Sequence, residues 1–266
     1  MSSLVLLEGQ KCTRCGDCLS VCPMKIFRGI KGHIPTVADY ADEGCIKCGH
    51  CAALCRAGAI SVGSITCETC TPNDSDKLPS FDSFAELVKY RRSIRHFNQK
   101  PVKQDDLDKL FEILRWSPTA KNRLPLKWIV VNGTEKIHKL AEIVIDEFRK
   151  EENTQQIIDA WDQDDYDWVF RGAPCLVFAY TETKNDWTAY DTTIGAEIAD
   201  LAAPLLGLGT CWAGFFIRSA GKYESLRKVL GLSPENEVGG ALMVGYPESE
   251  TYKKNPPRPK ADVRYI

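Results

Sequence analysis

The chain has 266 residues, of which 44% are hydrophobic and 26% are charged, and its formal net charge is −2. These values are ordinary for a globular protein of one or two domains. The charge balance predicts no nucleic-acid partner, and the absence of a long apolar run predicts no membrane association. The apolar run from Leu4 to Leu7 is too short for a secretory signal, so we expect a cytoplasmic protein.

Eight of the twelve cysteines follow one spacing that occurs twice, with gaps of three, three and four residues. The first run is Cys12, Cys15, Cys18 and Cys22, and the second is Cys45, Cys48, Cys51 and Cys55. This is the C-x2-C-x2-C-x3-C pattern of bacterial ferredoxins, in which the fourth cysteine of a run ligates the other cluster. We therefore expect two [4Fe–4S] clusters with crossed ligands: Cys12, Cys15, Cys18 and Cys55 for one, and Cys45, Cys48, Cys51 and Cys22 for the other.

Two other uses of these cysteines fit less well. Disulfide frameworks belong to small secreted domains, and no export signal precedes this cluster. Structural zinc takes four ligands from separated pairs, whereas this pattern supplies three ligands plus one. Residues 1–65 thus resemble two-cluster bacterial ferredoxins, with Arg56 where the family usually has Pro. We expect Gly16 and Gly49 to shape the loops, and the fourth cysteine of each run to begin the following helix.

The remaining cysteines are less informative. Cys67 and Cys70 form a lone CxxC just after the second run, which could be a redox pair or have no role. Cys175 and Cys211 lie in apolar runs and are expected to be small core residues.

A change in composition separates two domains. Segment 66–80 is rich in Thr, Pro, Asn, Asp and Ser, which predicts a linker between a domain at 1–65 and a domain at 81–266. Periodicity in the second domain predicts helices over 84–90, 105–116 and 191–209, and strands over 127–132, 175–180 and 240–247. The last helix should bury one apolar face, composed of Ile194, Ile198, Leu201, Leu205 and Leu208. Helices and strands without strict alternation predict an α+β fold.

One basic segment suits a phosphate monoester. Arg91, Arg92 and Arg95 surround Ser93 at the end of a predicted helix. Guanidinium groups and a hydroxyl bind phosphate through charge-assisted hydrogen bonds. A solvated basic face is an equally good explanation of this segment taken alone.

Four motifs in order resemble the nitroreductase family of FMN enzymes. "RRSIRHF" is similar to the family's R-x-S-x-R-x-F opening, and "SPTAKN" to its P-[ST]-[AS]-x-N loop. "LAAPLLGLGTCWAGFF" resembles its alanine-rich helix followed by a G-L-G-T strand, and "VGYP" with "PPRPKADV" resembles its tail. The likeness covers nearly all of residues 81–266. It implies an α-β-α sandwich with a mixed, mostly antiparallel sheet, in a homodimer that holds FMN at the subunit interface.

The resemblance also implies which residues bind FMN. It places Arg91, Arg92, Ser93 and Arg95 at the phosphate and the pyrimidine side of the ring. The flavin would be lined by Pro118, Thr119, Ala120 and Asn122. Ala213 and Gly214 would supply backbone near the flavin N5, and Arg258 would close on the phosphate. The chain departs from the family at Arg123, Leu124 and Leu126, where a Gln and a Trp are lost, which leaves the substrate class open. Residues 145–168 would be the family's variable insertion.

The two domains together predict an FMN-dependent oxidoreductase with a built-in ferredoxin relay. Electrons would pass from a low-potential donor, either a ferredoxin or NAD(P)H, through the two clusters to FMN and then to a small-molecule acceptor. No side chain is an obvious acid or base. Two alternatives stay open: a module that relays electrons to a protein partner, and a redox sensor.

Overall fold

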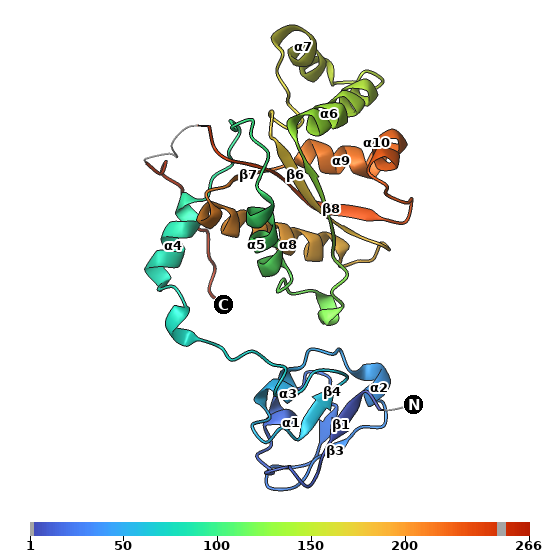
Figure 1. Cartoon of the computed structure of the whole chain (residues 1–266), viewed down its shortest axis with the longest axis vertical. Coiled ribbons are helices and arrows are strands. Elements are labelled where there is room, and N and C mark those ends of the chain that lie inside the picture. The colour runs from blue at the N-terminus through green and yellow to red at the C-terminus, as the bar shows by residue number, and fades with distance from the viewer. Residues whose placement is uncertain (1–2, 249–253) are drawn as a thin grey trace. The chain divides into compact units, whose positions relative to one another are not determined.

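Two units divide the chain in the computed structural model, which describes residues 3–248 and 254–266 (Figure 1). The first unit comprises Met1–Leu78 and Lys121–Arg123, and the second comprises Pro79–Ala120 and Leu124–Ile266. Each unit has its own buried apolar core. Among the described residues, no helix is long and apolar enough to cross a membrane.

The first unit closes on itself through its two ends. Strand β1 (Val5–Leu7) pairs antiparallel with β4 (Ile60–Val62), so the start and the end of the cysteine-rich segment lie side by side. A second two-stranded sheet forms between β2 (Phe27–Arg28) and β3 (Thr36–Val37). The helices of this unit are α1 (Asp17–Val21), α2 (Ala41–Gly44) and α3 (His50–Leu54).

A glycine precedes each of the two helices that carry cysteines. Gly16 and Gly49 have φ of +81° and +74°, the left-handed region that L side chains rarely adopt. A Cβ on Gly49 would also lie 3.0 Å from the Ile65 side chain. The helices last five residues, so the fourth cysteine of each run follows a helix instead of beginning one. The expectation for Cys22 and Cys55 was therefore wrong, because the helix already starts inside the ligand loop.

The connection between the units ends at a well-capped helix. A 3₁₀ turn, η1 (Ser75–Lys77), precedes α4 (Phe81–Tyr90). The Ser80 hydroxyl accepts a hydrogen bond from the Ser83 amide at 3.1 Å, which satisfies one of the free donors at the helix start. No residue of α4 is buried, although its apolar side chains are spaced for one face.

A four-stranded sheet forms the centre of the second unit. Its order is β5-β6-β8-β7, and every strand pair is antiparallel. A parallel bridge between Ser93 and Thr210 adds one more pairing at the β7 edge. The strands are β5 (Lys127–Asn132), β6 (Cys175–Thr181), β7 (Gly209–Trp212) and β8 (Glu237–Gly245). The sheet is mixed and mostly antiparallel, as predicted.

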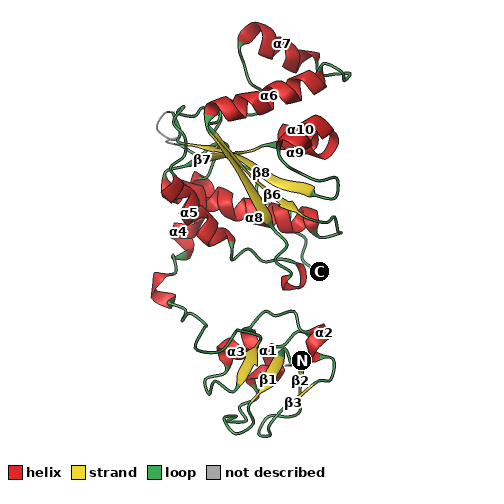
Figure 2. Ribbon diagram, turned by 45° about the vertical axis from the view of Figure 1, so that its right-hand side comes forward, coloured by secondary structure: helices red, strands yellow, loops and turns green. Residues whose placement is uncertain are grey.

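Helices cover both faces of this sheet (Figure 2). Along β6, Leu176 and Phe178 enter one core while Cys175 and Val177 enter the other, as the period of a strand requires. One face carries α5 (Gln104–Leu114), α8 (Thr188–Ala202) and the 3₁₀ turn η3 (Ala203–Leu206). The other carries α6 (Thr134–Phe148), α9 (Gly214–Lys222) and α10 (Glu224–Val229), with α7 (Gln155–Asp164) packed on α6.

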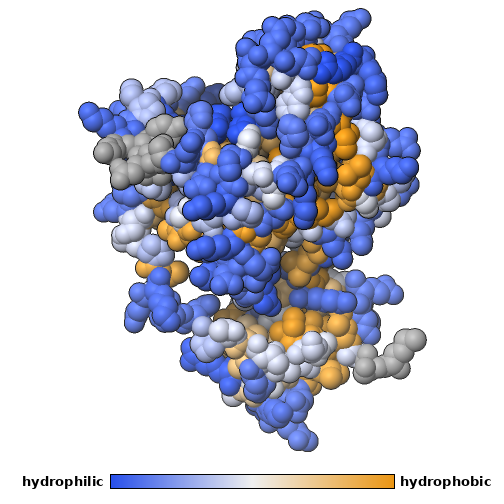
Figure 3. All heavy atoms as spheres, turned by 45° about the horizontal axis from the view of Figure 1, so that its top comes forward, coloured by the Kyte–Doolittle hydropathy of each residue, from blue (hydrophilic) through white to orange (hydrophobic). Residues whose placement is uncertain are grey.

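The buried face of α8 differs from the one expected. Its buried residues are small or polar: Thr188, Asp191, Thr192, Gly195, Ala196, Ala199 and Asp200. Leu205, which follows the helix, is 73% exposed, and Ile194 is 40% exposed. The reason is a close approach to β8, where a Cβ on Gly240 would lie 2.3 Å from the Thr192 carbonyl oxygen. Ile194 and Leu205 therefore face outward, whereas Leu208 is buried as expected and Ile198 packs against the core on this face of the sheet. Apolar patches show between hydrophilic side chains in Figure 3.

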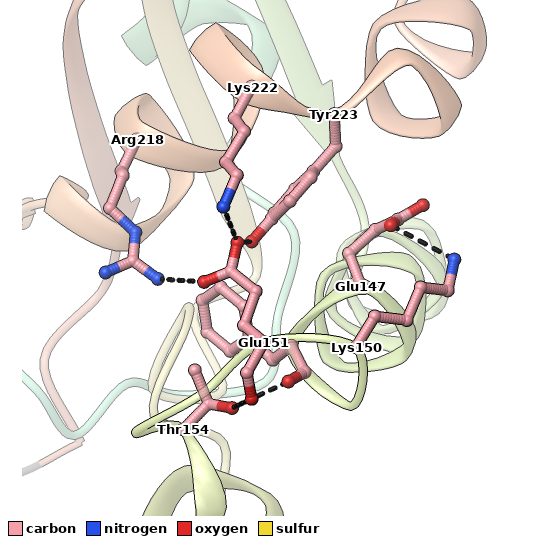
Figure 4. Close-up of polar contacts among 8 residues, drawn as sticks. Glu147, Lys150, Glu151, Thr154, Arg218, Lys222 and Tyr223 are labelled. Atoms are coloured by element: carbon pink, nitrogen blue, oxygen red, sulfur yellow. Dashed lines mark hydrogen bonds and ion pairs between the residues drawn. The ribbon is translucent and has the colours of Figure 1, made fainter.

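Segment 145–168 begins inside the core. Ile145 and Phe148, in the last turn of α6, are fully buried. The Glu151 carboxylate beyond them accepts hydrogen bonds from Lys222 and Tyr223, and Arg218 donates to it at 3.1 Å (Figure 4). This polar cluster fastens the end of α6 to α9 and to the start of α10.

Candidate functional sites

The eight cysteines of the repeat gather around two cavities in the first unit. Cys22, Cys45, Cys48 and Cys51 line one cavity. The other is lined by Cys12, Cys15, Cys18 and Cys55, and Cys51 lines it as well. Three cysteines of one loop thus meet the fourth cysteine of the other loop at each cavity. This is the crossed arrangement that the spacing predicts.

Electrostatics within each set favour a cationic occupant. Burial, together with the nearby thiols of Cys15, Cys12 and Cys55, raises the pKa of Cys18 to about 11. Burial, together with the neighbouring thiols of Cys48, Cys22 and Cys45, likewise raises the pKa of Cys51 to about 11. Four thiolates could not stand together in such a cavity without positive charge. Bound iron would supply that charge, and its binding would release the thiol protons.

Backbone amides point at several of the sulfurs. The Ile26 amide lies 3.4 Å from Cys22 Sγ, and the Ala59 amide lies 3.3 Å from Cys55 Sγ. Both amides belong to the fourth residue after their cysteine, so the two halves repeat this contact. The Arg14 amide makes a similar contact with Cys12 Sγ at 3.4 Å. Hydrogen bonds to cluster sulfurs are among the factors that set reduction potential.

Each cavity combines thiols with apolar side chains. Among the described residues, no three His, Cys, Asp or Glu side chains stand together in a way that could hold one metal ion. The thiols instead surround a space whose remaining lining is mostly apolar, including Val5, Phe27 and Val62 at one cavity. A set of four thiols around an apolar cavity suits an iron–sulfur cluster.

The basic segment of the second unit lies along the edge of the sheet. The Ile94 amide donates to the Thr210 carbonyl oxygen at 2.8 Å, which joins the segment to β7. A Cβ on Gly209 would lie 2.7 Å from the Ile94 side chain, so glycine is needed at that position. Arg91 forms an ion pair with Asp200 of α8 at 3.1 Å, and the Thr210 hydroxyl also hydrogen bonds to that carboxylate. Helix α8 therefore positions the first arginine of the motif.

Further positive charge gathers near Ser93. The Arg95 guanidinium donates to the Ser93 carbonyl oxygen at 3.3 Å. Burial raises the pKa of the neighbouring Cys211 thiol, while the charges of Arg95 and Arg171 oppose that rise. Arg171 is thus a cation close to this segment that the sequence did not single out. A lone arginine before a strand carries no motif signal, and only the fold brings it there.

The second flavin motif is held by α8 as well. The Ala120 amide donates to Asp191 at 2.9 Å, and the Leu124 amide donates to the Thr119 hydroxyl at 2.9 Å. Pro118 is exposed beside them. The 3₁₀ turn η2 (Ala120–Asn122) contains left-handed backbone, since Asn122 has φ of +51°. Asn122 falls in the short segment that groups with the first unit.

The last predicted flavin residues lie at a helix start and in the tail. Ala213 is fully buried, and its amide donates to Ala241 of β8 at 2.9 Å. Gly214 follows as the first residue of α9, where helix amides lack intrahelical acceptors. Arg258 lies in the exposed segment 254–266. Asn255 of that segment accepts a hydrogen bond from Arg92, which brings the tail to the basic segment.

Comparison with known proteins gives a consistent result. The nitroreductase family model matches residues 88–246, which is more than half of the chain, and a 4Fe-4S dicluster domain model matches residues 11–60. An Archaeoglobus fulgidus protein, provisionally named an NADH dehydrogenase/NAD(P)H nitroreductase, is 24% identical over 170 residues, which are 62% of this chain and 86% of that protein.

Solved structures share the fold of the second unit. A Bacteroides fragilis nitroreductase with bound FMN has a TM-score of 0.61 and 24% identity, and the match covers 69% of this chain and 98% of that one. A Desulfitobacterium hafniense nitroreductase with bound FMN has a TM-score of 0.58 and 20% identity, covering 69% and 97%. The chain therefore belongs to the nitroreductase family, the family of FMN-dependent oxidoreductases that its motifs predicted, and it carries a 4Fe-4S dicluster domain ahead of that fold.

Proposed function

We propose that this oxidoreductase carries its own two-cluster electron relay. Electrons would enter from a low-potential donor at two [4Fe–4S] clusters and reach FMN, where a small-molecule acceptor is reduced. Iron–sulfur clusters exchange electrons singly, whereas a flavin exchanges them singly or in pairs, so the combination suits a one-electron donor and a two-electron acceptor. The crossed thiol sets around two separate cavities are the observation that carries this proposal.

We propose that FMN phosphate binds at the basic segment. Arg95 and Ser93 stand at the edge of the sheet, with Arg171 nearby as added positive charge. Arg91 is held by Asp200, and we assign it to positioning this segment as well as to contact with the flavin. The ring would lie against Pro118, Thr119, Ala120 and Asn122, with Ala213 and Gly214 behind it. Arg92, through Asn255, would bring the tail with Arg258 over the phosphate.

We propose a homodimer, because the second unit leaves apolar side chains uncovered. Phe81, Phe84 and Val88 of α4 are all exposed, and Phe81 is 83% exposed. Exposed apolar patches commonly mark protein–protein interfaces. A second copy that covered α4 would also place its own residues beside the basic segment, which begins one residue after that helix. Gel filtration should give a mass near twice the 29.8 kDa of one chain.

The first test measures the cofactors. Protein purified without oxygen should contain about eight irons and eight sulfides per chain, as two cubanes require, together with one FMN. About one zinc and no sulfide would refute the relay. Bound FAD in place of FMN would refute the phosphate assignment.

The second test examines the electron path in the full-length protein. Cys15→Ser and Cys48→Ser each remove one ligand, from different cavities. Each should slow the reduction of FMN by reduced ferredoxin at least tenfold, while FMN content stays the same. Cys175→Ser, a cysteine outside both cavities, is the matched control for loss of a thiol. FMN reduction by the same donor at the original rate, in a variant whose iron content has fallen, would exclude the clusters from the path.

A further inference from the structure

Two cysteines outside the cluster cavities share a tight turn in the first unit. Cys67 and Cys70 are free and half-buried. The Cys70 amide donates to the Cys67 carbonyl oxygen at 3.2 Å, which closes a β-turn. The Cα atoms at the ends of such a turn are less than about 7 Å apart, which matches the separation that a disulfide bridges. The backbone therefore holds the two cysteines at a Cα separation that a disulfide can span.

Side chains of the turn hold it in this shape. The Thr66 amide donates to the Thr69 hydroxyl at 2.9 Å, and that hydroxyl donates to the Thr66 carbonyl oxygen at 3.0 Å. Ile65 is bridged to Val62 at the end of β4 by two backbone hydrogen bonds, of 2.9 and 3.0 Å. The cysteine pair is thus built onto the ordered sheet of the unit. A turn that is already closed raises the effective concentration of one thiol beside the other.

The turn also lies beside the second cysteine run. A Cβ on Gly49, between Cys48 and Cys51, would touch the Ile65 side chain at 3.0 Å. A Cβ on Gly58, three residues after Cys55, would lie 3.0 Å from a Glu68 carboxylate oxygen. Ile65 and Glu68, before and after Cys67, therefore lie against the second cysteine run and the turn that follows it.

We propose that Cys67 and Cys70 form a reversible disulfide, a third redox centre of the first unit that is oxidised by small disulfides and reduced by electrons from the iron–sulfur clusters. The second half of this inference rests on the proposed relay. In oxidation, the thiolate of one cysteine attacks a small disulfide of the glutathione class and releases one small thiol. The other cysteine then attacks the mixed disulfide and releases the second small thiol. In reduction, the protein disulfide takes up two electrons, delivered singly, and two protons to give two thiols.

This couple would make the chain responsive to its electron supply. When donor is plentiful, the pair would remain a dithiol. When donor is scarce and disulfides accumulate, the pair would become a disulfide beside the second cysteine run. The oxidation state of the Cys67–Cys70 pair, a two-electron couple, would then depend on whether the clusters of the one-electron relay are reduced.

Peptide mapping provides a direct test, because trypsin should release segment 57–77 with these two cysteines and no others. Holoprotein is equilibrated without oxygen in mixtures of oxidised and reduced glutathione. It is then quenched in acid, alkylated with a maleimide and digested. We expect the peptide to lose both maleimides and two hydrogens as oxidised glutathione increases. A peptide that carries two maleimides in every mixture would overturn the proposal.

Variants distinguish disulfide formation between Cys67 and Cys70 from general oxidation of thiols. Cys67→Ser and Cys70→Ser should each leave one thiol that keeps a bound glutathione. Thr69→Val retains both cysteines but removes the hydroxyl that fastens the turn, and it should shift the disulfide equilibrium toward dithiol by about fivefold, the usual worth of one hydrogen bond. Because each serine variant keeps only one of the two cysteines, neither can form this disulfide, and both serve as controls for general thiol oxidation. Loss of iron in step with disulfide formation would show attack on the ligands instead, and would overturn the proposal.

The second arm tests the link to the clusters. Oxidised holoprotein is freed of glutathione and reduced by photoreduced deazaflavin, a one-electron donor. The disulfide peptide should disappear at least tenfold faster in the unmodified protein than in Cys15→Ser or Cys48→Ser protein with lowered iron content. Equal rates would overturn reduction through the clusters. Because mapping requires neither FMN nor turnover, failure here with normal iron and flavin content leaves the proposed function standing. Absence of iron would refute both that function and this reduction step.

Discussion

The two units of this chain reach stability in different ways. Among the described residues, the buried core of the first unit consists of nine side chains, and two of these, Cys18 and Cys51, are cysteines of the ligand sets. The second unit buries apolar side chains on both faces of a sheet, including Phe148, Phe170 and Phe216 at no exposure. A small unit with a thin core usually depends on a metal or a disulfide, whereas a larger one does not. The comparison teaches that loss of the iron–sulfur clusters should destabilise the first unit and leave the second unit folded.

The largest expected effect comes from removal of the metal. Iron chelation under oxidising conditions should unfold the first unit, since its four-thiol sets lose the group that holds them together. The backbone amides of the second unit should stay protected from hydrogen exchange. Hydrogen exchange measured by mass spectrometry would show rapid exchange in α1 and α3 and slow exchange in β6 and β8. Equal loss of protection in both units would contradict the comparison.

A substitution in the core of the second unit should destabilise that unit and leave the first unit folded. Phe216→Ala removes a fully buried ring that lies 4.9 Å from the Phe178 ring centroid and 5.9 Å from that of Phe170. It should lower the free energy of unfolding of the second unit by about 3–5 kcal/mol. Iron content should not change. Denaturant unfolding followed by circular dichroism, with iron analysis, measures both.

Val229→Ala is the matched control for that experiment, because Val229 is 61% exposed on α10. It should alter the free energy of unfolding by no more than about 0.5 kcal/mol. A fall in iron content in Phe216→Ala protein would show that the two units depend on each other.

A smaller effect should be confined to flavin binding. Arg95→Ala removes a charge beside Ser93, and it should weaken FMN binding by about 1.5–3 kcal/mol, the usual worth of a charge-assisted hydrogen bond. Flavin fluorescence during titration of flavin-free protein measures the affinity. Arg115→Ala, an exposed arginine paired with Glu112 on α5, is the control and should have no effect. Unchanged affinity in an Arg91→Ala/Arg95→Ala double variant would refute the phosphate assignment.

The smallest effect concerns the polar cluster at Glu151. Hydrogen bonds from Lys222 and Tyr223, followed by the charges of Lys222 and Arg218, lower the pKa of Glu151 below its usual value of 4.5. A carboxylate with a lowered folded pKa contributes stability that is present above about pH 4.5 and lost as the pH falls through the folded pKa. Glu151→Gln should therefore speed amide exchange in α6 and α7 near neutral pH.

That difference should shrink as the pH falls below 4.5, because the native carboxylate is then protonated too. Glu152→Gln, an exposed neighbour, should show no difference at any pH. A constant difference between Glu151→Gln and the unmodified protein down to the lowest pH would mean that the charge of Glu151 is not the cause.

Much of the fold follows from local pattern. The strands at 127–132 and 175–180 and the helices near 84–90 and 105–116 appear within a few residues of their predicted bounds. The grouping of the cysteines around two cavities agrees with their spacing, because a short helix that contains the third cysteine of each run leads the fourth away from its own loop. Cys175 and Cys211 are buried, as their apolar surroundings indicated.

The rest depended on which elements meet in space. The buried face of α8 was mispredicted because hydrophobicity alone ignores how closely a helix can approach a glycine-bearing strand such as β8. Asp191 and Asp200 on that helix each hold a different one of the two segments proposed to bind FMN, and neither segment contains a signal for them. The sequence by itself therefore determined the ligand types, the motifs and most elements, since those depend on neighbours along the chain. Only the tertiary structure decided which carboxylates and cations stand beside them, since such contacts join residues about 70 to 110 positions apart.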